Sequence, residues 1–417
     1  MEVSTTSLVN YMPNGSPRRP RVIQLYYITH VKNVPSILER GILSHEKVEA
    51  EGIQFEPVYD REIVKSRRAR NTPDGKSLWH YANMYFQPRN PMLYRVTCER
   101  PVSEIAVLAI DFQWVIGQLG ALITTGNAAS TNSEIFPISK RGTAYPRFRD
   151  ALGLEFWKEE DSSKRRIMAE CLVPDIVPPE AIKTIFVANQ DAAAGLRKRL
   201  DQSGYGFVDV IPEPSMFFQP SKTVPLTSNL SLVEGDMFFS RMQTLTVSVN
   251  CVGVMGKGLA SRAKYQFPDV YVKYQDLCRN HTLQLGKPYL YKREGSFDYQ
   301  LADEPQTLTA ANAETWFLLF PTKKHWREKA SMEGIEKGLK WVQTQYADQG
   351  IKSLSVPALG AGLGRLDWSE VGPAICQSLA PLGIPVQVYL PAEKKIPDKE
   401  LTKDFLLPKN STLSVAR

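Results

Sequence analysis

A glycine-rich turn between a strand pattern and a helix pattern constrains the fold of this chain more than any other feature. An alternating segment, 244–249, runs through Asn250 into Gly253-Val-Met-Gly-Lys-Gly258, and a helical pattern follows over 257–267. Such a turn presents backbone N–H groups and a helix N-terminus to an anion. Its spacing matches neither G-x-x-x-x-G-K-[ST] nor G-x-G-x-x-G. The sequence therefore predicts an anion site on a strand–loop–helix unit of another type.

A second glycine loop, Gly360-Ala-Gly-Leu-Gly364, follows another strand pattern at 353–356. Two such loops can close on a diphosphate from both sides. In this order, and with Asp236 at the end of an earlier strand, they resemble the macrodomain, a module that binds ADP-ribose. The resemblance covers residues 229–391. It implies an ADP-ribose site made of Asp236, Asn250, Gly253, Val254, Met255, Gly256, Lys257, Gly258, Thr322, Gly360, Ala361, Gly362, Leu363 and Gly364.

Strand and helix patterns alternate through this second half. Strands are expected at 230–234, 245–249, 316–320, 353–356 and 386–389, and helices at 257–267, 331–347 and 368–379. Such alternation predicts an α/β domain in which helices sandwich a parallel or mixed sheet. The loops at the carboxyl ends of its strands are the expected ligand site.

The length of the chain predicts two domains, of which the macrodomain-like region is the second. Its composition predicts a cytoplasmic protein. A chain of 417 residues exceeds one ordinary core. Hydrophobic residues make up 43%, without an apolar run of the ~20 residues that a membrane span requires. The five cysteines are scattered and form no C-x-x-C pair, which predicts reduced thiols and no metal site.

The expected organisation has five parts. They are a disordered N-terminus (1–20), a first domain (21–212), a proline-rich linker (213–228), the macrodomain-like region (229–391) and a polar tail (392–417). Within the first domain, strands are expected at 22–28, 105–114, 165–173, 184–188 and 207–211. A helix should begin after a capping Asn33 and end at Gly41, a second should span 192–200, and a long ordered loop should span 117–150.

A basic window at 61–100 points to a polyanionic partner. It holds nine Lys/Arg against three acids, a balance of +6, within a chain of net charge +7, and aromatic residues interleave with the charges. Basic side chains neutralise phosphates and aromatic faces stack on unpaired bases. The alternative is a solvated charged face whose aromatic residues belong to the core. Composition alone leaves both interpretations open, and it does not separate DNA from RNA.

Between the two glycine loops, the segment Phe320-Pro-Thr-Lys-Lys-His-Trp-Arg327 follows an expected buried strand. This motif resembles the DarG subfamily of macrodomains, antitoxins that remove ADP-ribose from thymidine in DNA. The resemblance implies that Lys323 is catalytic, with Lys324 as the alternative if the register differs by one. A lysine whose pKa is lowered can act at the anomeric carbon or stabilise the leaving base. The remaining alternative is a surface lysine that only contacts phosphate or DNA.

Three motifs in the first half occur in a family-specific order. They are Lys65-Ser-Arg-Arg-Ala-Arg70, Phe86-Gln-Pro-Arg-Asn-Pro-Met-Leu-Tyr94 and Ile167-Met-Ala-Glu-Cys-Leu-Val173. In this order they resemble DarT, the toxin partner of DarG. The resemblance covers residues 22–212. It implies an α+β ADP-ribosyltransferase domain that takes ADP-ribose from NAD, without a metal, and attaches it to thymidine in single-stranded DNA.

The DarT resemblance also assigns roles. Arg67 matches the catalytic arginine and Glu170 the catalytic glutamate, whose carboxylate suits an oxocarbenium-like transition state and removal of the thymine N3 proton. The alternative for Glu170 is a solvent-facing residue of an edge strand. NAD contacts are expected at Tyr27, Thr29, His30 and Arg67, and relatives often have histidine where this chain has Tyr27. DNA contacts are expected at Arg68, Arg70, Tyr85, Arg89, Tyr94 and Arg147, with Asn127 and Asn132 as further base contacts.

The sequence thus predicts a fusion of a toxin with its antitoxin, in which one domain attaches ADP-ribose to DNA and the other removes it. Its expected partners are NAD, single-stranded DNA and ADP-ribosylated DNA, and the two domains can contact each other within the chain. Two alternatives remain. The macrodomain-like half only binds ADP-ribose or sterically restrains the transferase, or the transferase modifies RNA or protein.

Overall fold

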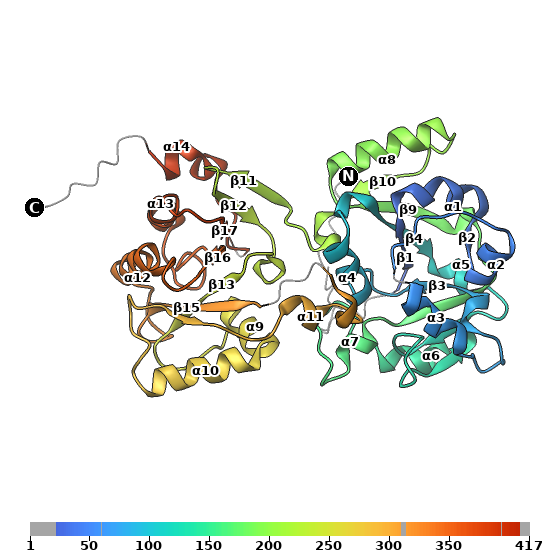
Figure 1. Ribbon diagram of the computed structural model, residues 1–417, viewed down its shortest axis with the longest axis horizontal. Helices are drawn as coiled ribbons and strands as arrows, with labels where there is room; N and C mark the ends of the chain where they lie inside the picture. The colour runs from blue at the N-terminus through green and yellow to red at the C-terminus, as the bar shows by residue number, and fades with distance from the viewer. Residues whose placement is uncertain (1–21, 60, 310–313, 393, 409–417) are drawn as a thin grey trace, which may run out of the picture. The chain divides into compact units, whose positions relative to one another are not determined.

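A computed structural model describes residues 22–59, 61–309, 314–392 and 394–408. The chain forms two compact units (Figure 1). The first comprises Met1–Phe217 and Gln300–Ala310, and the second comprises Phe218–Tyr299 and Ala311–Arg417. The N-terminal segment expected to be disordered, 1–20, lies outside the described residues. No helix in the described part of the chain combines the length and apolar character that a membrane span needs.

The first unit is built on an eight-stranded, mainly antiparallel sheet of order β10-β9-β4-β1-β3-β7-β5-β6, in which β9 and β10 run parallel. Its strands are β1 (Gln24–His30), β3 (Tyr81–Tyr85), β4 (Ile105–Asp111), β5 (Leu122–Thr124), β6 (Ile135–Pro137), β7 (Glu170–Pro174), β9 (Ile182–Val187) and β10 (Val210–Pro212). The short strands β2 (Ile42–Leu43) and β8 (Ile176–Val177) pair separately. The central strand β4 is buried along nearly all its length, as expected of a strand covered on both faces.

Helices connect these strands in the described part of the first unit. They are α1 (Val34–Arg40), α2 (His45–Ala50), α3 (Arg61–Ala69), α4 (Pro91–Glu99), α5 (Phe112–Ile116), α6 (Arg141–Ala144), α7 (Ser163–Arg166) and α8 (Gln190–Gln202). Helix α1 ends at Gly41, whose φ of 89° favours glycine. The side chain of Asn33 does not cap α1, contrary to expectation. It bonds Thr29 and the backbone of Glu56 instead, so it ties β1 to the loop after α2.

A short segment from the second half of the sequence completes the first unit. We call residues 300–309 the crossover segment; it begins in the last turn of helix α11 (Phe297–Leu301). The indole N–H of Trp157, a fully buried side chain, donates to the Leu301 carbonyl at 2.7 Å. The buried Arg95 guanidinium donates from Nε to Asp303 at 3.0 Å, and the Asp303 N–H donates to the Pro91 carbonyl. The first unit is therefore not contained in one continuous stretch of chain.

The second unit contains a seven-stranded mixed sheet of order β11-β12-β17-β16-β13-β15-β14. Its inner pairings are parallel and its two edge strands, β11 and β14, are antiparallel to their neighbours. The strands are β11 (Lys222–Pro225), β12 (Leu230–Glu234), β13 (Thr244–Asn250), β14 (Tyr289–Tyr291), β15 (Trp316–Lys323), β16 (Leu354–Pro357) and β17 (Val386–Tyr389). Its remaining helices are α9 (Gly258–Gln266), α10 (Pro268–Arg279), α12 (Met332–Gln345), α13 (Trp368–Leu379) and α14 (Lys403–Leu406).

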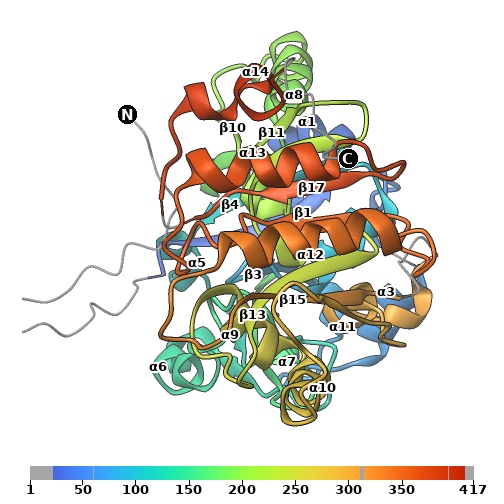
Figure 2. The same cartoon turned by 90° about the vertical axis from the view of Figure 1, so that its left-hand side faces the viewer.

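Alternation along β15 explains why helices cover both faces of this sheet. Phe320 packs against α12, where a Cβ at Gly338 would lie 2.4 Å from the Phe320 ring. Phe317 points the other way and meets Phe267, between α9 and α10, at a centroid distance of 4.7 Å. Helices α12 and α13 lie side by side over the sheet (Figure 2). The expected α/β sandwich with a mixed sheet is confirmed.

Several local expectations were wrong. The supposed linker contains β11, which pairs with β12, and the 117–150 loop contains β5, β6 and α6. Residues 163–166 form a helical turn, so the strand expected at 165–173 begins at Glu170. The polar tail contains α14, which buries Leu406. Short edge strands and single helical turns carry too few periodic positions to be found from sequence.

Candidate functional site

The centre of the first unit is a buried ion pair between Arg67 and Glu170. Glu170 begins β7, opposite Tyr85 of β3, and its side chain is fully buried. Arg67, in the last turn of α3, donates from Nη2 to Oε2 at 2.9 Å and from Nη1 to Oε1 at 3.2 Å. Burial alone would lower the pKa of Arg67, but the adjacent Glu170 carboxylate outweighs it and the pKa is raised. The solvent-facing alternative for Glu170 is therefore excluded.

The loop after β5 holds the same carboxylate from a second side. The Ala128 N–H donates to Glu170 Oε1 at 2.9 Å. The Thr124 hydroxyl accepts from the Glu170 N–H at 2.9 Å and donates to the Gly126 carbonyl at 2.6 Å. Arg70 donates to the Ser133 carbonyl at 2.7 Å and so fixes the far end of this loop. These contacts hold the buried carboxylate in one orientation, where its charge can stabilise a developing positive charge with little screening by water.

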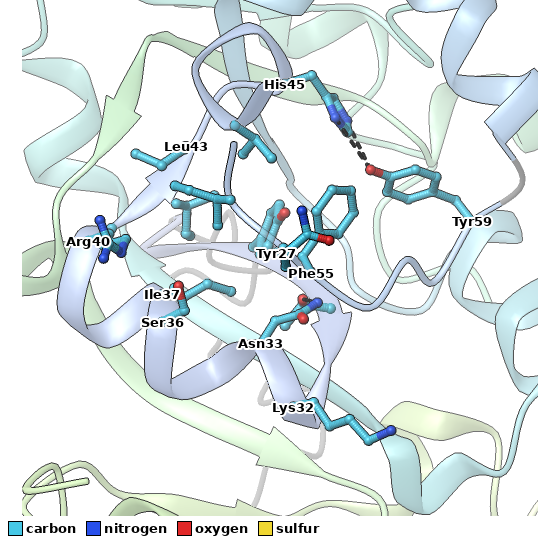
Figure 3. Close-up of a pocket in the computed structure, with 16 residues that line it drawn as sticks. Tyr27, Lys32, Asn33, Ser36, Ile37, Arg40, Leu43, His45, Phe55 and Tyr59 are labelled. Atoms are coloured by element: carbon cyan, nitrogen blue, oxygen red, sulfur yellow. Dashed lines mark hydrogen bonds between the residues drawn. The ribbon is translucent and has the colours of Figure 1, made fainter. Parts of the chain in front are cut away.

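A pocket opens beside α1 and α2 (Figure 3). Tyr27 and Thr29 of β1 form part of its wall, and the other lining residues come from the turn before α1, from α1, β2 and α2, and from the loop after α2. They include Lys32, Asn33, Ser36, Arg40, His45, Phe55 and Tyr59. The Arg67 charge adds to the effect of burial that lowers the pKa of His45, and it opposes the larger effect of burial that raises the pKa of Tyr59, so the ion pair lies next to this pocket. Aromatic side chains with a few polar groups among them are a typical lining for a ligand site.

His45 and Tyr59 form a neutral hydrogen-bonded pair at the pocket wall (Figure 3). Burial, followed by the charge of Arg67, lowers the pKa of His45 from 6.5 to about 4. Burial raises the pKa of Tyr27 from 10.0 to about 12. These groups therefore present uncharged polar atoms to a ligand at neutral pH. Neither His45 nor Tyr59 stands out in the sequence, because their proximity depends on how α2 and the following loop fold back.

His30 does not line this pocket, contrary to expectation. Successive strand residues face opposite ways, so Thr29 lines the pocket while His30 is buried elsewhere. His30 Nδ1 accepts from the Lys32 N–H, and Nε2 donates to Glu104 at 3.4 Å. Its burial lowers its pKa. His30 thus stabilises the turn after β1.

The expected DNA contacts divide into exposed and buried residues. Arg68 is exposed and lies 4.9 Å from the Trp79 ring, and the half-exposed Arg147 packs over Phe136 and pairs with Glu134. Tyr85 and Tyr94 are buried at 7% and 2% exposure, so they are core residues here rather than stacking surfaces. Arg89 is half-buried, and Asn132 is exposed. Asn127 caps the backbone of Ala129.

The two glycine loops of the second unit converge at the carboxyl ends of β13 and β16. Asn250 shapes the first loop: its Oδ1 accepts from the Val252 N–H, and its Nδ2 donates to the Val254 carbonyl. Gly253 and Gly360 have φ values of 78° and 77°, which other residues rarely adopt. A Cβ at Gly258 would lie 3.1 Å from Leu363, so the loops meet.

Lys323 ends β15 opposite Asn250 and reaches across to the second loop. Its Nζ donates to the Leu363 carbonyl at 3.4 Å. Burial and then the positive charge of Arg365 lower its pKa, which the Glu328 carboxylate opposes. The neighbouring Lys324 is exposed, and its carbonyl accepts from the Cys251 N–H. Lys323 is thus the lysine that points between the glycine loops.

Two of the residues expected to contact ADP-ribose, Asp236 and Thr322, form hydrogen bonds with other residues of the protein. Asp236 accepts from the Phe238 N–H at 3.0 Å and from Arg262 at 2.5 Å, and that guanidinium lies over the rings of Phe238 and Phe239. Thr322 is buried and bonds Ser248 at 2.9 Å. The sequence analysis missed Arg262 because nothing in the α9 pattern singles it out. In the described residues, no three His, Cys, Asp or Glu side chains gather as metal ligands.

Comparison with known proteins gives a consistent result for both units. Residues 26–218 match the family "ssDNA thymidine ADP-ribosyltransferase, DarT", and residues 308–375 match the macro domain family. The macrodomain-like half is similar to a DNA ADP-ribosyl glycohydrolase from Thermus aquaticus, at 38% identity over 39% of this chain and 42% of that protein.

A relative from Thermosipho africanus matches across both units. It is named a DNA ADP-ribosyl transferase–DNA ADP-ribosyl glycohydrolase fusion protein, and it is 54% identical over 93% of this chain and 99% of its own length. The solved structure of Thermosipho africanus DarTG in complex with ADP-ribose covers 92% of this chain and all of that one, with a TM-score of 0.86 and 53% identity. The chain therefore belongs to the family of DarT–DarG fusion proteins, in which a DNA ADP-ribosyltransferase precedes a DNA ADP-ribosyl glycohydrolase macrodomain.

Proposed function

We propose that the first unit transfers ADP-ribose from NAD to thymidine in single-stranded DNA and that the second unit removes it by hydrolysis. The observation that carries the proposal is the fully buried Glu170, held by Arg67 and the Ala128 N–H beside the pocket that Tyr27 and Thr29 line. Lys323, directed between two glycine loops in the second unit, is the corresponding feature of the reverse reaction.

In the first unit, NAD binds in the pocket bounded by Tyr27, Thr29 and Asn33. The bond between nicotinamide and the ribose C1 breaks, and nicotinamide leaves with the electron pair. Positive charge develops at the ribose, and the Glu170 carboxylate stabilises it. The thymine N3 forms the new bond to C1, and its proton passes to Glu170. Arg67 holds the carboxylate in place and supplies a cation toward the NAD diphosphate.

In the second unit, ADP-ribose binds with its diphosphate between the glycine loops, whose backbone N–H groups face the anion. Asp236 accepts from the adenine amino group once Arg262 releases it. Lys323 acts at the bond between ribose C1 and thymine N3. As a neutral amine it attacks C1 and displaces thymine N3, and water then displaces the amine from C1; as an ammonium it stabilises the departing base while water attacks C1 directly. Water supplies the oxygen that ends on C1, and thymine N3 regains a proton.

The test separates the two activities with one substitution in each unit. The Glu170→Ala chain should remove ADP-ribose from a purified modified oligonucleotide and add none. The Lys323→Ala chain should add one ADP-ribose to a thymidine oligonucleotide with NAD, and fail on the same oligonucleotide carrying uridine. Mass spectrometry of the strand reads both.

The outcomes also decide between the rival functions. Binding of ADP-ribose by the Glu170→Ala chain without its release from DNA would leave the second unit as a binding module only. Modification of the uridine strand at equal rate would make RNA an equally suitable substrate. Modification of the protein and not of either strand would contradict the transferase assignment to nucleic acid.

A further inference from the structure

An exposed aromatic turn lies directly beyond Lys323. Residues 323–329 contain four Lys/Arg and one acid, Glu328. Within this turn Trp326 is 48% exposed, a large share for the largest side chain. The His325 ring lies 5.3 Å from it at an interplanar angle of 32°, and the Arg327 guanidinium lies 4.6 Å from its centroid. The turn thus presents an aromatic face framed by cations.

Hydrogen bonds fix this turn to both glycine loops. The Cys251 N–H donates to the Lys324 carbonyl at 3.0 Å, and the Ala330 N–H donates to the Gly364 carbonyl at 2.9 Å. The Arg327 N–H donates to His325 Nδ1, and Glu328 accepts from the His325 N–H. Trp326 is therefore held at a defined place beside the reactive lysine.

Arg365 joins the turn from the second loop. Its φ of 62° is a left-handed conformation that costs a non-glycine residue about 1 kcal/mol or more. This conformation sets its exposed guanidinium against the turn, where Nη2 donates to the Arg327 carbonyl at 3.5 Å. The strained residue thus carries a positive charge near Lys323, and a polyanionic substrate would be attracted to a positive charge at this place.

The surrounding rim is apolar and open. Val252, Val254 and Leu363, at the tips of the two loops, are 46%, 42% and 55% exposed. An apolar rim, an exposed indole and several cations match a single nucleic-acid strand, whose bases stack and whose phosphates pair with arginine.

We propose that Trp326, Arg327 and Arg365, the Trp326 platform, hold the single-stranded DNA that flanks the modified nucleotide. A base next to the ADP-ribosylated thymidine stacks on Trp326, and its phosphates contact Arg327 and Arg365. Trp326 positions the strand and takes no part in bond breaking. This inference rests on the proposed hydrolysis, and it adds how the second unit recognises DNA beyond ADP-ribose.

The test compares two substrates of the full chain carrying Glu170→Ala, so that no new ADP-ribose is added. One is an ADP-ribosylated oligonucleotide and the other is ADP-ribosylated thymidine alone. Trp326→Ala should raise KM for the oligonucleotide roughly ten-fold or more, since base stacking has this strength. Its kcat and its KM for the mononucleoside should not change. Trp326→Phe should restore most of the loss. Arg327→Gln and Arg365→Gln should weaken the salt dependence of the oligonucleotide KM.

Tyr265→Ala is the matched control. Tyr265 lies on α9, is 58% exposed and also has a lysine over its ring, Lys264 at 5.4 Å. It should change neither substrate. Equal effects of Trp326→Ala on both substrates, or an effect on neither, would overturn the platform.

Cross-linking separates this inference from the proposed function. A single strand that carries 4-thiothymidine beside the modified thymidine should cross-link to the peptide containing Trp326, even if the protein releases no ADP-ribose. Absence of release would refute the hydrolysis, while cross-links confined to other peptides of the second unit would refute the platform.

Discussion

Replacing Asp303 should destabilise the first unit, although Asp303 follows more than 80 residues of the second unit in the sequence. Its carboxylate accepts from Arg95 Nε at 3.0 Å, and the Arg95 side chain is 1% exposed. Arg95 Nη1 keeps Glu99 as a partner, while Nη2 already lacks one among the described residues. In Asp303→Ala, two of the three guanidinium nitrogens are thus buried without an acceptor.

The magnitude follows from this geometry. Removing one member of a buried pair costs about 3–5 kcal/mol, and the retained Glu99 contact reduces this to about 2–4 kcal/mol. For a unit of this size, that corresponds to a fall in Tm of roughly 5–15 °C. Asp303→Asn should cost less, because it keeps an acceptor oxygen. Burial also raises the pKa of Asp303 against the effect of Arg95, so its charge itself is expensive to bury.

Calorimetry of the full chain provides the assay. The two units should unfold in separate transitions, and the one that a non-hydrolysable NAD analogue raises belongs to the first unit. Asp303→Ala should lower that transition alone. Glu304→Ala, at the exposed neighbouring position, is the control and should shift it little. An unchanged transition in Asp303→Ala would refute the role of the crossover segment.

Three further results are expected. The free energy of unfolding of the first unit should fall as the pH drops from 6.5 toward 4. His45 binds a proton in this range in the unfolded chain, whereas in the folded protein its pKa is about 4 and it stays neutral. Urea unfolding measured at several pH values should show a smaller loss of stability in His45→Gln. If the neutral Lys323 amine reacts, Arg365→Gln should raise its pKa and move the pH–rate profile for ADP-ribosyl thymidine to higher pH, and Glu328→Gln should move it lower. Glu170→Gln should reduce transfer to DNA by at least about a hundred-fold in a nicotinamide-release assay.

Sequence patterns located much of the second unit because its inner strands are apolar and alternate with amphipathic helices. The expected strands at 230–234 and 386–389 match β12 and β17. Glycine loops are equally visible, since a positive φ leaves few alternatives to glycine. Asp236, by contrast, gave no sign of its partner Arg262, because that contact depends on how α9 packs.

In the first unit, the sequence identified Arg67 and Glu170 by motif, but their contact spans 103 positions and belongs to the fold. The basic window at 61–100 led to the prediction that Tyr85 and Tyr94 contact DNA, but both are buried. Composition does not show which face of a strand or helix a residue occupies. The crossover segment was not predictable at all. Its short stretch has no periodicity, and the burial of Arg95 becomes evident only when the distant segment is in place.

The most direct measurement of the central claim is a time course of ADP-ribose on a single-stranded thymidine oligonucleotide incubated with NAD, followed by mass spectrometry. With the Lys323→Ala chain, modified strand should accumulate. With the unsubstituted chain it should stay low while free ADP-ribose and nicotinamide rise together, because one unit reverses what the other makes. Accumulation of modified strand at the same rate with both chains would contradict removal of ADP-ribose by the second unit. No modification with either chain would contradict transfer of ADP-ribose to DNA by the first unit.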